Sequence, residues 1–365
     1  MRIFFTGGGT GGHLYPALAI ARAAVKLDGS VRPYFIGAQR GIEREILPKS
    51  EFEHVLLDLH PLYRSRPWEN WKTARGFLRA WREIDRIARQ ERPAALVGTG
   101  GYAAGAALAW AAMKRVPIGI QEQNSFPGLT VRYFSAFARE VWLGFPEASG
   151  LLRLRSTGSA VDTGNPIAPP PDPRPVREAA RLSWNLPHDD GAVLLVTGGS
   201  QGSRALNDAM AEWIRAGIPG SLSVIWATGR ANFDAYRDFE SPRVRVRAYL
   251  DPMANAYAAA DLALTRAGAM TTAELSAWGI PMVLVPLPTA AADHQTANAV
   301  ALQAAGAAIH LPQSQLGVQS LRETIEPLVL NRSRFRELAA GALKRARPDA
   351  AAQIAKRLLD MAASG

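Results

Sequence analysis

Cysteine is absent from this chain of 365 residues. Disulfide bonds and thiolate metal sites are therefore excluded, and the composition fits a reducing cytoplasm. Long apolar runs are missing too, because the longest weakly apolar stretch, Ala103 to Met113, is too short to span a bilayer. The first residues, Met1 to Phe5, are typical of a strand rather than of a signal peptide.

Acidic residues are in deficit. The chain has 42 lysines and arginines against 32 aspartates and glutamates, which gives a formal charge of +10. Such a balance favours anionic partners, whether nucleic acid, an acidic lipid surface or a phosphorylated substrate. Zinc-finger spacing, a recognisable RNA-binding signature and a basic tail are all lacking. We therefore expect no nucleic-acid partner.

Two glycine-rich loops each separate a short apolar strand from the start of a helix. The first loop, Gly7 to His13, follows the run Arg2 to Thr6, and the second, Gly198 to Gly202, follows Val193 to Thr197. A strand, a glycine turn and a helix N-terminus together place backbone N–H groups where they can face an anion. Because the loops lie roughly half a chain apart, they predict two Rossmann-like halves.

The first loop has other interpretations. Gly7, Gly9 and Gly12 satisfy the dinucleotide fingerprint G-x-G-x-x-G. That fingerprint needs a carboxylate after the second strand to hold a ribose, yet the strand at 32–36 ends in residues 37–40, which contain none. A Gly-Lys-Ser/Thr phosphate loop is also absent. The alternative that the glycines only permit tight turns stays open.

Apolar strands alternate with helices through both halves of the chain. This alternation predicts an α/β protein with parallel sheets covered on both faces. The proline-rich stretch 163–175 is typical of a linker. We expect one Rossmann-like domain over residues 1–162, a second over 163–344, and a helix at about 345–365 that packs back on the first. The predicted strands are 2–6, 31–36, 94–98, 117–121, 140–143, 192–197, 222–227, 243–247, 261–265 and 281–286.

Polar residues follow two strands of the second half. Residues 261–265 lead into a helix start at 266–275, where Thr271 or Thr272 can cap the helix and Glu274 falls in its first turn. Glu274 could equally accept hydrogen bonds from the two hydroxyls of a ribose.

The loop after the next strand is rich in amides. It carries Asp293, His294, Gln295 and Asn298 close together. Such groups suit the hydroxyls of a sugar, and ordinary helix capping by Asp293 is the alternative.

Two further loops follow strands of the first half. They are Gly98 to Tyr102 and Gln121 to Ser125. Because loops at the carboxyl ends of parallel strands line the ligand crevice, we expect both to lie near His13.

The segment Arg64 to Arg92 is rich in arginine and tryptophan. At helical spacing Ala74, Phe77, Leu78, Trp81, Ile84 and Ala88 share one face, and basic residues share another. An amphipathic helix of this kind, entered through tryptophans, suits the headgroup layer of an anionic membrane; a surface helix whose apolar face is simply core is the alternative. The residues predicted to meet the membrane are Trp68, Trp71, Lys72, Arg75, Arg79, Trp81, Arg82 and Arg86.

Seven motifs span nearly the whole chain. In order they are Gly8-Gly9-Thr10-Gly11-Gly12-His13, Gly100-Gly101-Tyr102, Glu122-Gln123-Asn124, Gly164-Asn165-Pro166, Gly198-Gly199-Ser200-Gln201-Gly202, Arg266-Ala267-Gly268-Ala269 with Glu274, and Asp293-His294-Gln295. Together they resemble the bacterial UDP-N-acetylglucosamine–N-acetylmuramyl-(pentapeptide) pyrophosphoryl-undecaprenol N-acetylglucosamine transferases, the glycosyltransferases of GT-B fold that make lipid II from lipid I.

The resemblance implies two domains that face a central cleft, and the substrates UDP-N-acetylglucosamine (UDP-GlcNAc) and lipid I. It implies no cofactor and no active-site metal, and a peripheral place at the cytoplasmic face of the plasma membrane, on anionic lipid.

The resemblance also implies residue roles. In the first domain Thr10, Gly11, Gly12 and Asn124 would touch the donor sugar or diphosphate, Tyr102 would bind substrate, and His13 and Glu122 would be the catalytic base or its support. In the second domain it assigns Ser200, with Gln201 beside it, to phosphate, and the backbone of Leu250 to uracil. It assigns His294 and Gln295 to the GlcNAc hydroxyls. The residues that it assigns to diphosphate and ribose are Ala269, Met270, Thr271, Thr272, Ala273 and Glu274.

The chain departs from the family at two positions. Ile167-Ala168 stand where the family often has an arginine after Gly-Asn-Pro, so that phosphate contact is lost or moved. Gln121 stands where the family often has a histidine, which disfavours a mechanism that uses a histidine there.

The expected chemistry is an inverting transfer. UDP leaves with growing negative charge, which helix N-termini can stabilise without a metal, and the sequence contains no Asp-x-Asp element. The muramyl C4 hydroxyl needs a general base near neutral pH, for which His13 is suited. Two alternatives stay open: another GT-B enzyme that uses a UDP-sugar, such as a glycolipid synthase or a UDP-GlcNAc epimerase, and a catalytically silent, membrane-associated nucleotide-sugar sensor.

Overall fold

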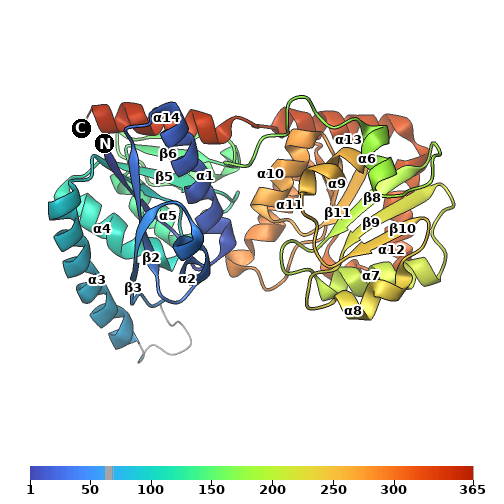
Figure 1. The fold of residues 1–365 in the computed structure, drawn as a ribbon, viewed down its shortest axis with the longest axis horizontal. Helices are drawn as coiled ribbons and strands as arrows, with labels where there is room; N and C mark the ends of the chain where they lie inside the picture. Colours follow the sequence, from blue (N-terminus) through green and yellow to red (C-terminus); the bar gives the residue numbers. More distant parts are fainter. Residues whose placement is uncertain (62–67, 69, 365) are drawn as a thin grey trace. The chain divides into compact units, whose positions relative to one another are not determined.

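The computed structural model describes residues 1–61, 68 and 70–364 (Figure 1). The chain divides into two compact units. Unit 1 comprises Met1–Ala168 and Asp349–Gly365, and unit 2 comprises Pro169–Pro348. The first division lies inside the proline-rich linker, slightly beyond the expected boundary at 162/163, and the second follows the expected boundary at 344/345 by a few residues.

Unit 1 is built on a seven-stranded sheet in which all pairings are parallel. Its strand order is β3-β2-β1-β4-β5-β6-β7. The strands are β1 (Arg2–Thr6), β2 (Arg32–Ala38), β3 (Glu53–Leu57), β4 (Ala95–Gly98), β5 (Ile118–Glu122), β6 (Glu140–Leu143) and β7 (Ser159–Asp162). The helices are α1 (Gly11–Leu27), α2 (Glu43–Ile46), α3 (Asn70–Glu91), α4 (Gly105–Lys114), α5 (Leu129–Phe134) and α14 (Ala350–Ala363), with 3-10 turns η1 (Leu47–Lys49), η3 (Tyr102–Ala104), η4 (Ser135–Phe137) and η5 (Pro146–Leu151).

Alternating side chains of this sheet enter two different cores. Phe4 of β1 packs with α3, α4 and α5 on one face, whereas its neighbours Ile3 and Phe5 pack with α1 and α14 on the other. Burial on both faces explains why the central strands are continuous apolar runs in the sequence.

Helix α14 belongs to unit 1 although it follows the whole of unit 2 in the chain. Its side chains Ile354, Ala355 and Leu358 are fully buried, in the same core as Ile20 of α1. The two helices lie side by side in Figure 1.

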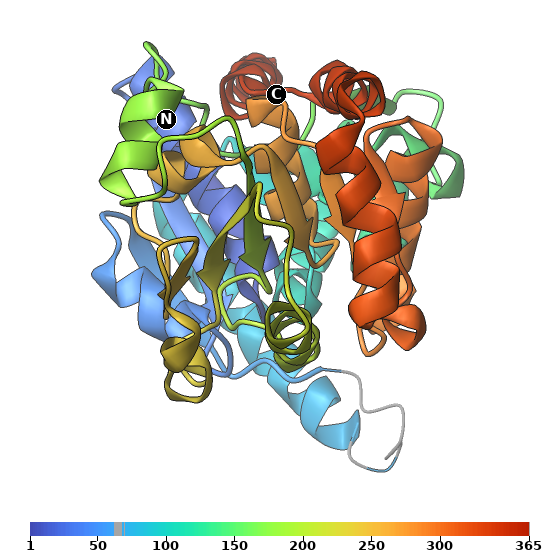
Figure 2. The ribbon, with the colours of Figure 1, turned by 90° about the vertical axis from the view of Figure 1, so that its right-hand side faces the viewer.

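Unit 2 repeats this architecture with six parallel strands in the order β10-β9-β8-β11-β12-β13 (Figure 2). The strands are β8 (Ala192–Thr197), β9 (Leu222–Ala227), β10 (Val244–Arg247), β11 (Leu262–Thr265), β12 (Met282–Leu284) and β13 (Ala308–His310). The helices are α6 (Arg177–Ser183), α7 (Arg204–Arg215), α8 (Phe233–Tyr236), α9 (Met253–Ala259), α10 (Ala269–Trp278), α11 (His294–Ala304), α12 (Val318–Leu330) and α13 (Arg332–Arg345), with 3-10 turns η6 (Arg237–Phe239), η7 (Ala291–Asp293) and η8 (Gln313–Gln315). Helices α7 and α12 share one core with the sheet.

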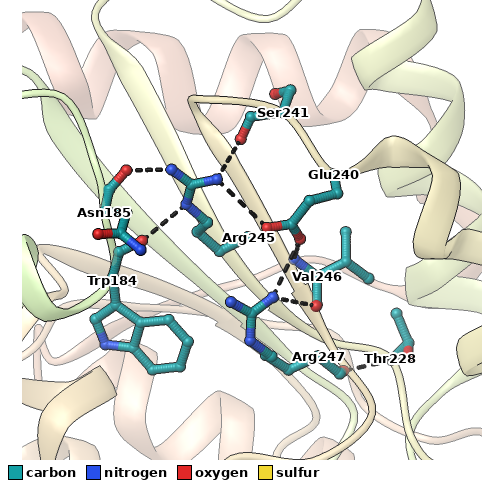
Figure 3. A network of polar contacts seen from close by, with 8 residues as sticks. All are labelled: Trp184, Asn185, Thr228, Glu240, Ser241, Arg245, Val246 and Arg247. Atoms are coloured by element: carbon teal, nitrogen blue, oxygen red, sulfur yellow. Dashed lines mark hydrogen bonds and ion pairs between the residues drawn. The ribbon is translucent and has the colours of Figure 1, made fainter.

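The edge strand β10 is covered by a polar network (Figure 3). Its sequence alternates valine and arginine, and the valines are buried. Arg245 donates to the carbonyl of Trp184 at 2.7 Å and to the carbonyl of Asn185. Arg247 donates to the carboxylate of Glu240 at 3.2 Å. Charged side chains over an edge discourage pairing with another chain, so this network protects the open side of the sheet.

Three strands were not predicted from the sequence. They are β3, β7 and β13, and each lies at the edge of its sheet. Edge strands are partly exposed and carry mixed residues, such as Glu53 and His54 in β3, so they lack the apolar run on which the prediction relied.

Candidate functional site

Each sheet has one point where the strand order reverses. In unit 1 it lies between β1 and β4, where Thr6 pairs with Gly98, and in unit 2 between β8 and β11, where Thr197 pairs with Thr265. Ligands of open α/β sheets bind outside the carboxyl ends of the strands at this point. Each glycine-rich loop leaves the sheet there, so each unit presents a candidate binding site.

The two glycine loops of unit 1 pack backbone against backbone. The amide of Gly8 donates to the carbonyl of Gly100 at 3.3 Å. Gly101 has φ +77°, and a Cβ there would collide with the carbonyl oxygen of Gly8. Only glycine satisfies both conditions, so the second motif exists to let the first approach closely.

His13 lies over this junction and is held in one tautomer. Its Nδ1 is 2.9 Å from the carbonyl oxygen of Thr99 and 3.1 Å from Oε1 of Gln123. Both partners accept, so Nδ1 carries the proton of the neutral ring and Nε2 carries the lone pair. The imidazole is partly exposed.

Glu122 is buried beneath the loop that it precedes. Its carboxylate accepts from the amide of Asn124 at 2.9 Å, from the Asn124 side chain at 3.3 Å and from the amide of Gly128 at 3.0 Å. Burial raises the pKa of the Glu122 carboxyl, and these hydrogen bonds oppose the rise. The geometry is that of a residue that shapes the 122–128 loop.

The position where the family often has a histidine belongs here to an amide network. Gln121 is fully buried and donates to Oδ1 of Asn165 at 3.1 Å, while Asn165 donates to the carbonyl of Gln123 at 3.0 Å. The chain Gln121–Asn165–Gln123 ends at His13, so it supports the imidazole without contributing a titratable group. Ile167, at the family's arginine position, is buried, with 3% of its surface exposed.

Glu43 was missed by the sequence analysis. It is fully buried, and its Oε2 accepts from the amide of Gly9 at 2.9 Å while Oε1 accepts from Ala38 at 3.4 Å. An internal carboxylate therefore occupies the anion position at Gly9. No local pattern signals this role, because α2 meets the glycine loop only through the fold.

The other predicted residues of unit 1 surround this junction. Thr10 is exposed and precedes α1 as its N-cap without a side-chain cap bond. Gly12 is exposed, Gly11 and Asn124 are partly exposed, and Tyr102 donates its hydroxyl to the carbonyl of Arg40.

The glycine loop of unit 2 is more open than that of unit 1. Gly202 has φ +75°, and a Cβ there would collide with the carbonyl oxygen of Thr228. Ser200 and Gln201 are exposed, and their amides make no hydrogen bond within the part of the chain that the structure describes. These amides precede α7, so a phosphate could accept from them.

Helix α10 begins earlier than the sequence analysis predicted. Gly268 is its N-cap, and Thr272 donates to the carbonyl of Ala269 at 3.1 Å from inside the helix. The predicted cap at Thr271 or Thr272 is therefore wrong, and Glu274 lies in the second turn rather than the first. The free backbone amides belong to Ala269 and the residues just after it.

Glu274 makes one side-chain hydrogen bond among the described residues. The hydroxyl of Tyr257, on α9, donates to its Oε2 at 2.6 Å. Burial raises the pKa of the Glu274 carboxyl, and the bond from Tyr257 opposes that rise. Leu250, just before α9, is buried, with 3% of its surface exposed.

The amide-rich loop packs against the same switch point. Asn298 is fully buried and donates to the carbonyl of Ala267 at 3.1 Å, which ties α11 to the start of α10. Gln295 accepts from the amide of Leu287 at 3.0 Å, and Nδ1 of His294 lies 2.8 Å from the carbonyl of Ala291.

Arg266 anchors the strand end beneath this loop. It is buried and donates to the carbonyls of Val285 at 3.1 Å and Pro286 at 3.0 Å and to Gln313 at 2.7 Å. Because β11 and β12 are parallel neighbours, the loops that lead into α10 and α11 leave the same edge of the sheet. Asp293 precedes α11 without a cap bond to the backbone.

Helix α3 presents both of the expected faces, but the apolar face is split along its length. Ile84 and Ala88 are buried in the core, whereas Leu78 and Trp71 are 60% and 59% exposed, and Trp68, which precedes the helix, is 73% exposed. Trp81 is partly buried, Phe77 is exposed, and the side chains of Lys72 and Ala74 lie outside the described residues, as do Arg64 and Arg66.

The basic face of α3 is exposed. Arg75, Arg79 and Arg82 form no ion pair with any described residue, whereas Arg86 pairs with Glu83 at 2.5 Å. The N-terminal turns of this helix extend away from the rest of unit 1 (Figures 1 and 2).

Two kinds of feature are absent from the described residues. No helix there is long and apolar enough to cross a membrane. No group of three or more histidine, aspartate and glutamate side chains there could hold a metal ion.

Comparison with known proteins assigns the chain to a family. Residues 3–143 match the glycosyltransferase family 28 N-terminal domain, and residues 193–354 match the family 28 C-terminal domain. A UDP-N-acetylglucosamine–N-acetylmuramyl-(pentapeptide) pyrophosphoryl-undecaprenol N-acetylglucosamine transferase of Salinibacter ruber is 40% identical over 99% of this chain and 96% of its own length. The chain belongs to this family of GlcNAc transferases.

Other members of the GlcNAc transferase family agree over the full length. The protein of the same description from Moorella thermoacetica is 36% identical over 100% of both chains. The crystal structure of Acinetobacter baumannii MurG has a TM-score of 0.79 and 27% identity, over 98% of this chain and 99% of that one. The chain is therefore a glycosyltransferase with the two Rossmann-like domains of the GT-B fold.

Proposed function

We propose that this chain transfers N-acetylglucosamine from UDP-GlcNAc to the C4 hydroxyl of the muramyl sugar of lipid I, which gives lipid II, with inversion at the anomeric carbon. The observation that carries the proposal is full-length membership of the GlcNAc transferase family together with a polar site at the switch point of each sheet. The proposal assigns the base to unit 1 and nucleotide binding to unit 2.

In unit 1, His13 acts as the general base. Nδ1–H donates to the Thr99 carbonyl, so Nε2 takes the proton of the acceptor hydroxyl as its oxygen attacks the anomeric carbon. The hydrogen bond to Thr99 then stabilises the imidazolium that forms. Glu122 supports the site by ordering the loop around Asn124 rather than by accepting the proton.

In unit 2, the helix N-termini stabilise the leaving UDP. The exposed amides at Ser200 and Gln201 and the first turn of α10 donate to the diphosphate as the bond from the anomeric carbon to its oxygen breaks. Glu274 accepts from the ribose, the backbone at Leu250 meets uracil, and Gln295 with His294 contacts the GlcNAc hydroxyls. These roles require neither a cofactor nor a metal.

Incubation with UDP-GlcNAc and a lipid I analogue tests the function. UDP release that depends on the acceptor, with a β-linked disaccharide product, is the expected result. Interconversion of UDP-GlcNAc and its manno epimer without acceptor would instead identify an epimerase. Donor binding without turnover would identify a nucleotide-sugar sensor.

We further propose that the enzyme works as a peripheral protein at the cytoplasmic face of the plasma membrane. The support is the exposed surface of α3, with Trp71 and with Arg75, Arg79 and Arg82, which form no ion pair with any described residue, and the exposed Trp68 just before the helix. Each basic residue near an anionic bilayer contributes about 1 kcal/mol.

Vesicles of phosphatidylglycerol test this second proposal. Replacing Arg75, Arg79 and Arg82 with Glu should abolish binding at low salt, while turnover of a short-chain, water-soluble acceptor is kept. The matched control replaces three exposed arginines of unit 2, Arg237, Arg334 and Arg336, with Glu. If both triple variants lose vesicle binding equally, net charge rather than α3 is responsible.

A further inference from the structure

Two features of Glu274 set the starting point. Its Oε2 accepts from the Tyr257 hydroxyl at 2.6 Å, and its Oε1 makes no hydrogen bond within the described residues. The side chain is partly exposed, so Oε1 can meet a ligand.

Tyr257 is itself fixed in place. Only 5% of its surface is exposed, and its ring packs on that of Trp278 with 5.8 Å between centroids. Trp278 lies one turn beyond Glu274 on α10, so the tyrosine contacts α10 twice. Arg174 lies over the other ring of this pair, 5.5 Å from the Trp278 centroid.

The helix that carries Tyr257 starts shortly after the residue expected to meet uracil. Helix α9 begins at Met253, just after Leu250, while α10 begins at the small-residue loop. A contact between Tyr257 and Glu274 therefore joins the expected uracil position to the expected ribose position.

We propose that Tyr257 is a positioning residue for the donor: by donating to Oε2 of Glu274, it fixes the carboxylate so that Oε1 accepts from a ribose hydroxyl of a uridine nucleotide. This inference rests on the proposed function, because it assumes that Glu274 meets the ribose. In this proposal Tyr257 acts through Glu274 without contacting the nucleotide, and it lies outside the seven motifs found in the sequence.

The hydrogen bond also sets the pH range of binding. It lowers the pKa of Glu274 against the rise caused by burial. Removing the hydroxyl therefore raises the pKa of Glu274. The carboxylate is then protonated at a higher pH, and donor affinity falls at that higher pH as well. Three other groups lie nearby. Tyr249 raises the pKa of the Tyr257 hydroxyl through its charge, and Arg174 donates to the carbonyl of Ala277. From α13, the uncharged Leu343 lies against Gly279.

Tyr257→Phe tests the proposal with UDP as the probe in calorimetry. The Kd for UDP should rise about twofold to tenfold, the range for the net contribution of one ordinary hydrogen bond, while kcat at saturating UDP-GlcNAc changes less than about twofold. The midpoint at which UDP affinity falls in acid should move to higher pH. Tyr257→Phe should also weaken the preference for UDP over 2′-deoxy-UDP and 3′-deoxy-UDP.

Tyr236→Phe is the matched control. Tyr236 is a buried tyrosine of the same unit whose hydroxyl donates to Asp208 at 2.7 Å, in the core beside α7. Its loss should lower the melting temperature but leave the Kd for UDP and the acid midpoint unchanged. An equal change in both variants would show a general loss of stability and would overturn the proposal.

Two further measurements separate the possible failures. If Tyr257→Phe does not fold, 3,5-difluorotyrosine incorporated at position 257 gives a more acidic donor, and the acid midpoint of UDP binding should then move to lower pH; no movement overturns the proposal. If wild-type protein binds UDP but shows no transfer, the proposed function fails while the role of Tyr257 can still be measured. An active wild type with an unchanged Kd in Tyr257→Phe overturns only the role of Tyr257.

Discussion

The loop Gly7 to His13 of unit 1 and the loop Gly198 to Gly202 of unit 2 have similar sequences but different surroundings. In unit 1 the amide of Gly9 is bonded to the buried carboxylate of Glu43, and Gly101 packs on Gly8. In unit 2 no such carboxylate lies at the loop among the described residues, and Ser200 and Gln201 are exposed. The first loop is therefore a packed junction that positions His13, whereas the second is open to an anion. One motif thus serves two purposes, and only the partners of its amides distinguish them.

The largest expected effect comes from His13, the proposed base, which lies at the end of the first loop. His13→Ala should lower kcat by about 10²–10⁴, the usual contribution of a general base, with donor KM changed little. The measurement is steady-state kinetics with a lipid I analogue, with the melting temperature as a check on folding. His294→Ala, in unit 2, should instead change donor KM. A fall in kcat of less than about tenfold in His13→Ala would transfer the role to Glu122 or water.

The second prediction concerns the internal carboxylate of unit 1. Glu43→Ala should lower the free energy of unfolding of unit 1 by about 2–4 kcal/mol, because it opens a cavity and leaves the Gly9 amide unsatisfied. Urea denaturation followed by tryptophan fluorescence measures the loss. Glu45→Ala, an exposed change on the same short helix, should cost less than about 0.5 kcal/mol. Equal costs for the two variants would mean that Glu43 does not hold the loop.

The third prediction concerns the donor side. Glu274→Ala should raise donor KM about tenfold or more, since charge-assisted hydrogen bonds contribute roughly 1.5–3 kcal/mol. Burial raises the pKa of Glu274 above the ordinary glutamate value of 4.5. As the pH is lowered, wild-type donor affinity should therefore begin to fall at a pH higher than 4.5. Stability responds in the opposite direction: the folded state binds this proton more readily, so the contribution of Glu274 to stability rises as the pH falls through this range. Unchanged donor kinetics in Glu274→Ala would contradict the assignment.

The smallest effect distinguishes two serines of the second loop. Ser200→Ala should raise donor KM about twofold to tenfold, as expected for one hydrogen bond, without loss of stability. Ser203→Ala should do the reverse and cost about 1 kcal/mol of stability, since its Oγ caps α7 by accepting from the amide of Leu206 at 3.4 Å. Thermal unfolding and donor kinetics on both variants check this contrast. If Ser200→Ala destabilises the protein as much as Ser203→Ala does, the loop is structural in both units.

The sequence was sufficient for the central strands and for the loops that follow them. Strands buried on both faces must be apolar throughout, so β1, β6, β8 and β9 were located almost to the residue. The edge strands β3, β7 and β13 were not, because their residues face solvent as well as the core, whereas the edge strand β10 was located through its alternating valines. The start of α10 was misplaced for a related reason: Gly268 caps the helix through its backbone, and no side chain marks the position.

The partners of the site residues were less accessible to sequence reasoning than the residues themselves. Glycines, His13 and Glu274 stand out because they follow strands. Glu43, Asn165 and Tyr257 reach them only after the fold has brought distant segments together, across separations along the chain that no local pattern encodes. A single sequence thus indicates candidate site residues, and the three-dimensional structure is needed to show what orients them.

Unit 2 is, topologically, an insertion into unit 1, because Asp349 onwards returns to the first core. During synthesis on a ribosome, the chain up to Ala168 therefore emerges without the helix that covers one face of its sheet. Ile354 and Leu358 become available only after all of unit 2 has been translated, so unit 2 can complete its core first. Until then Ile20 and its neighbours on α1 lack the apolar side chains of α14 that complete their core in the folded unit.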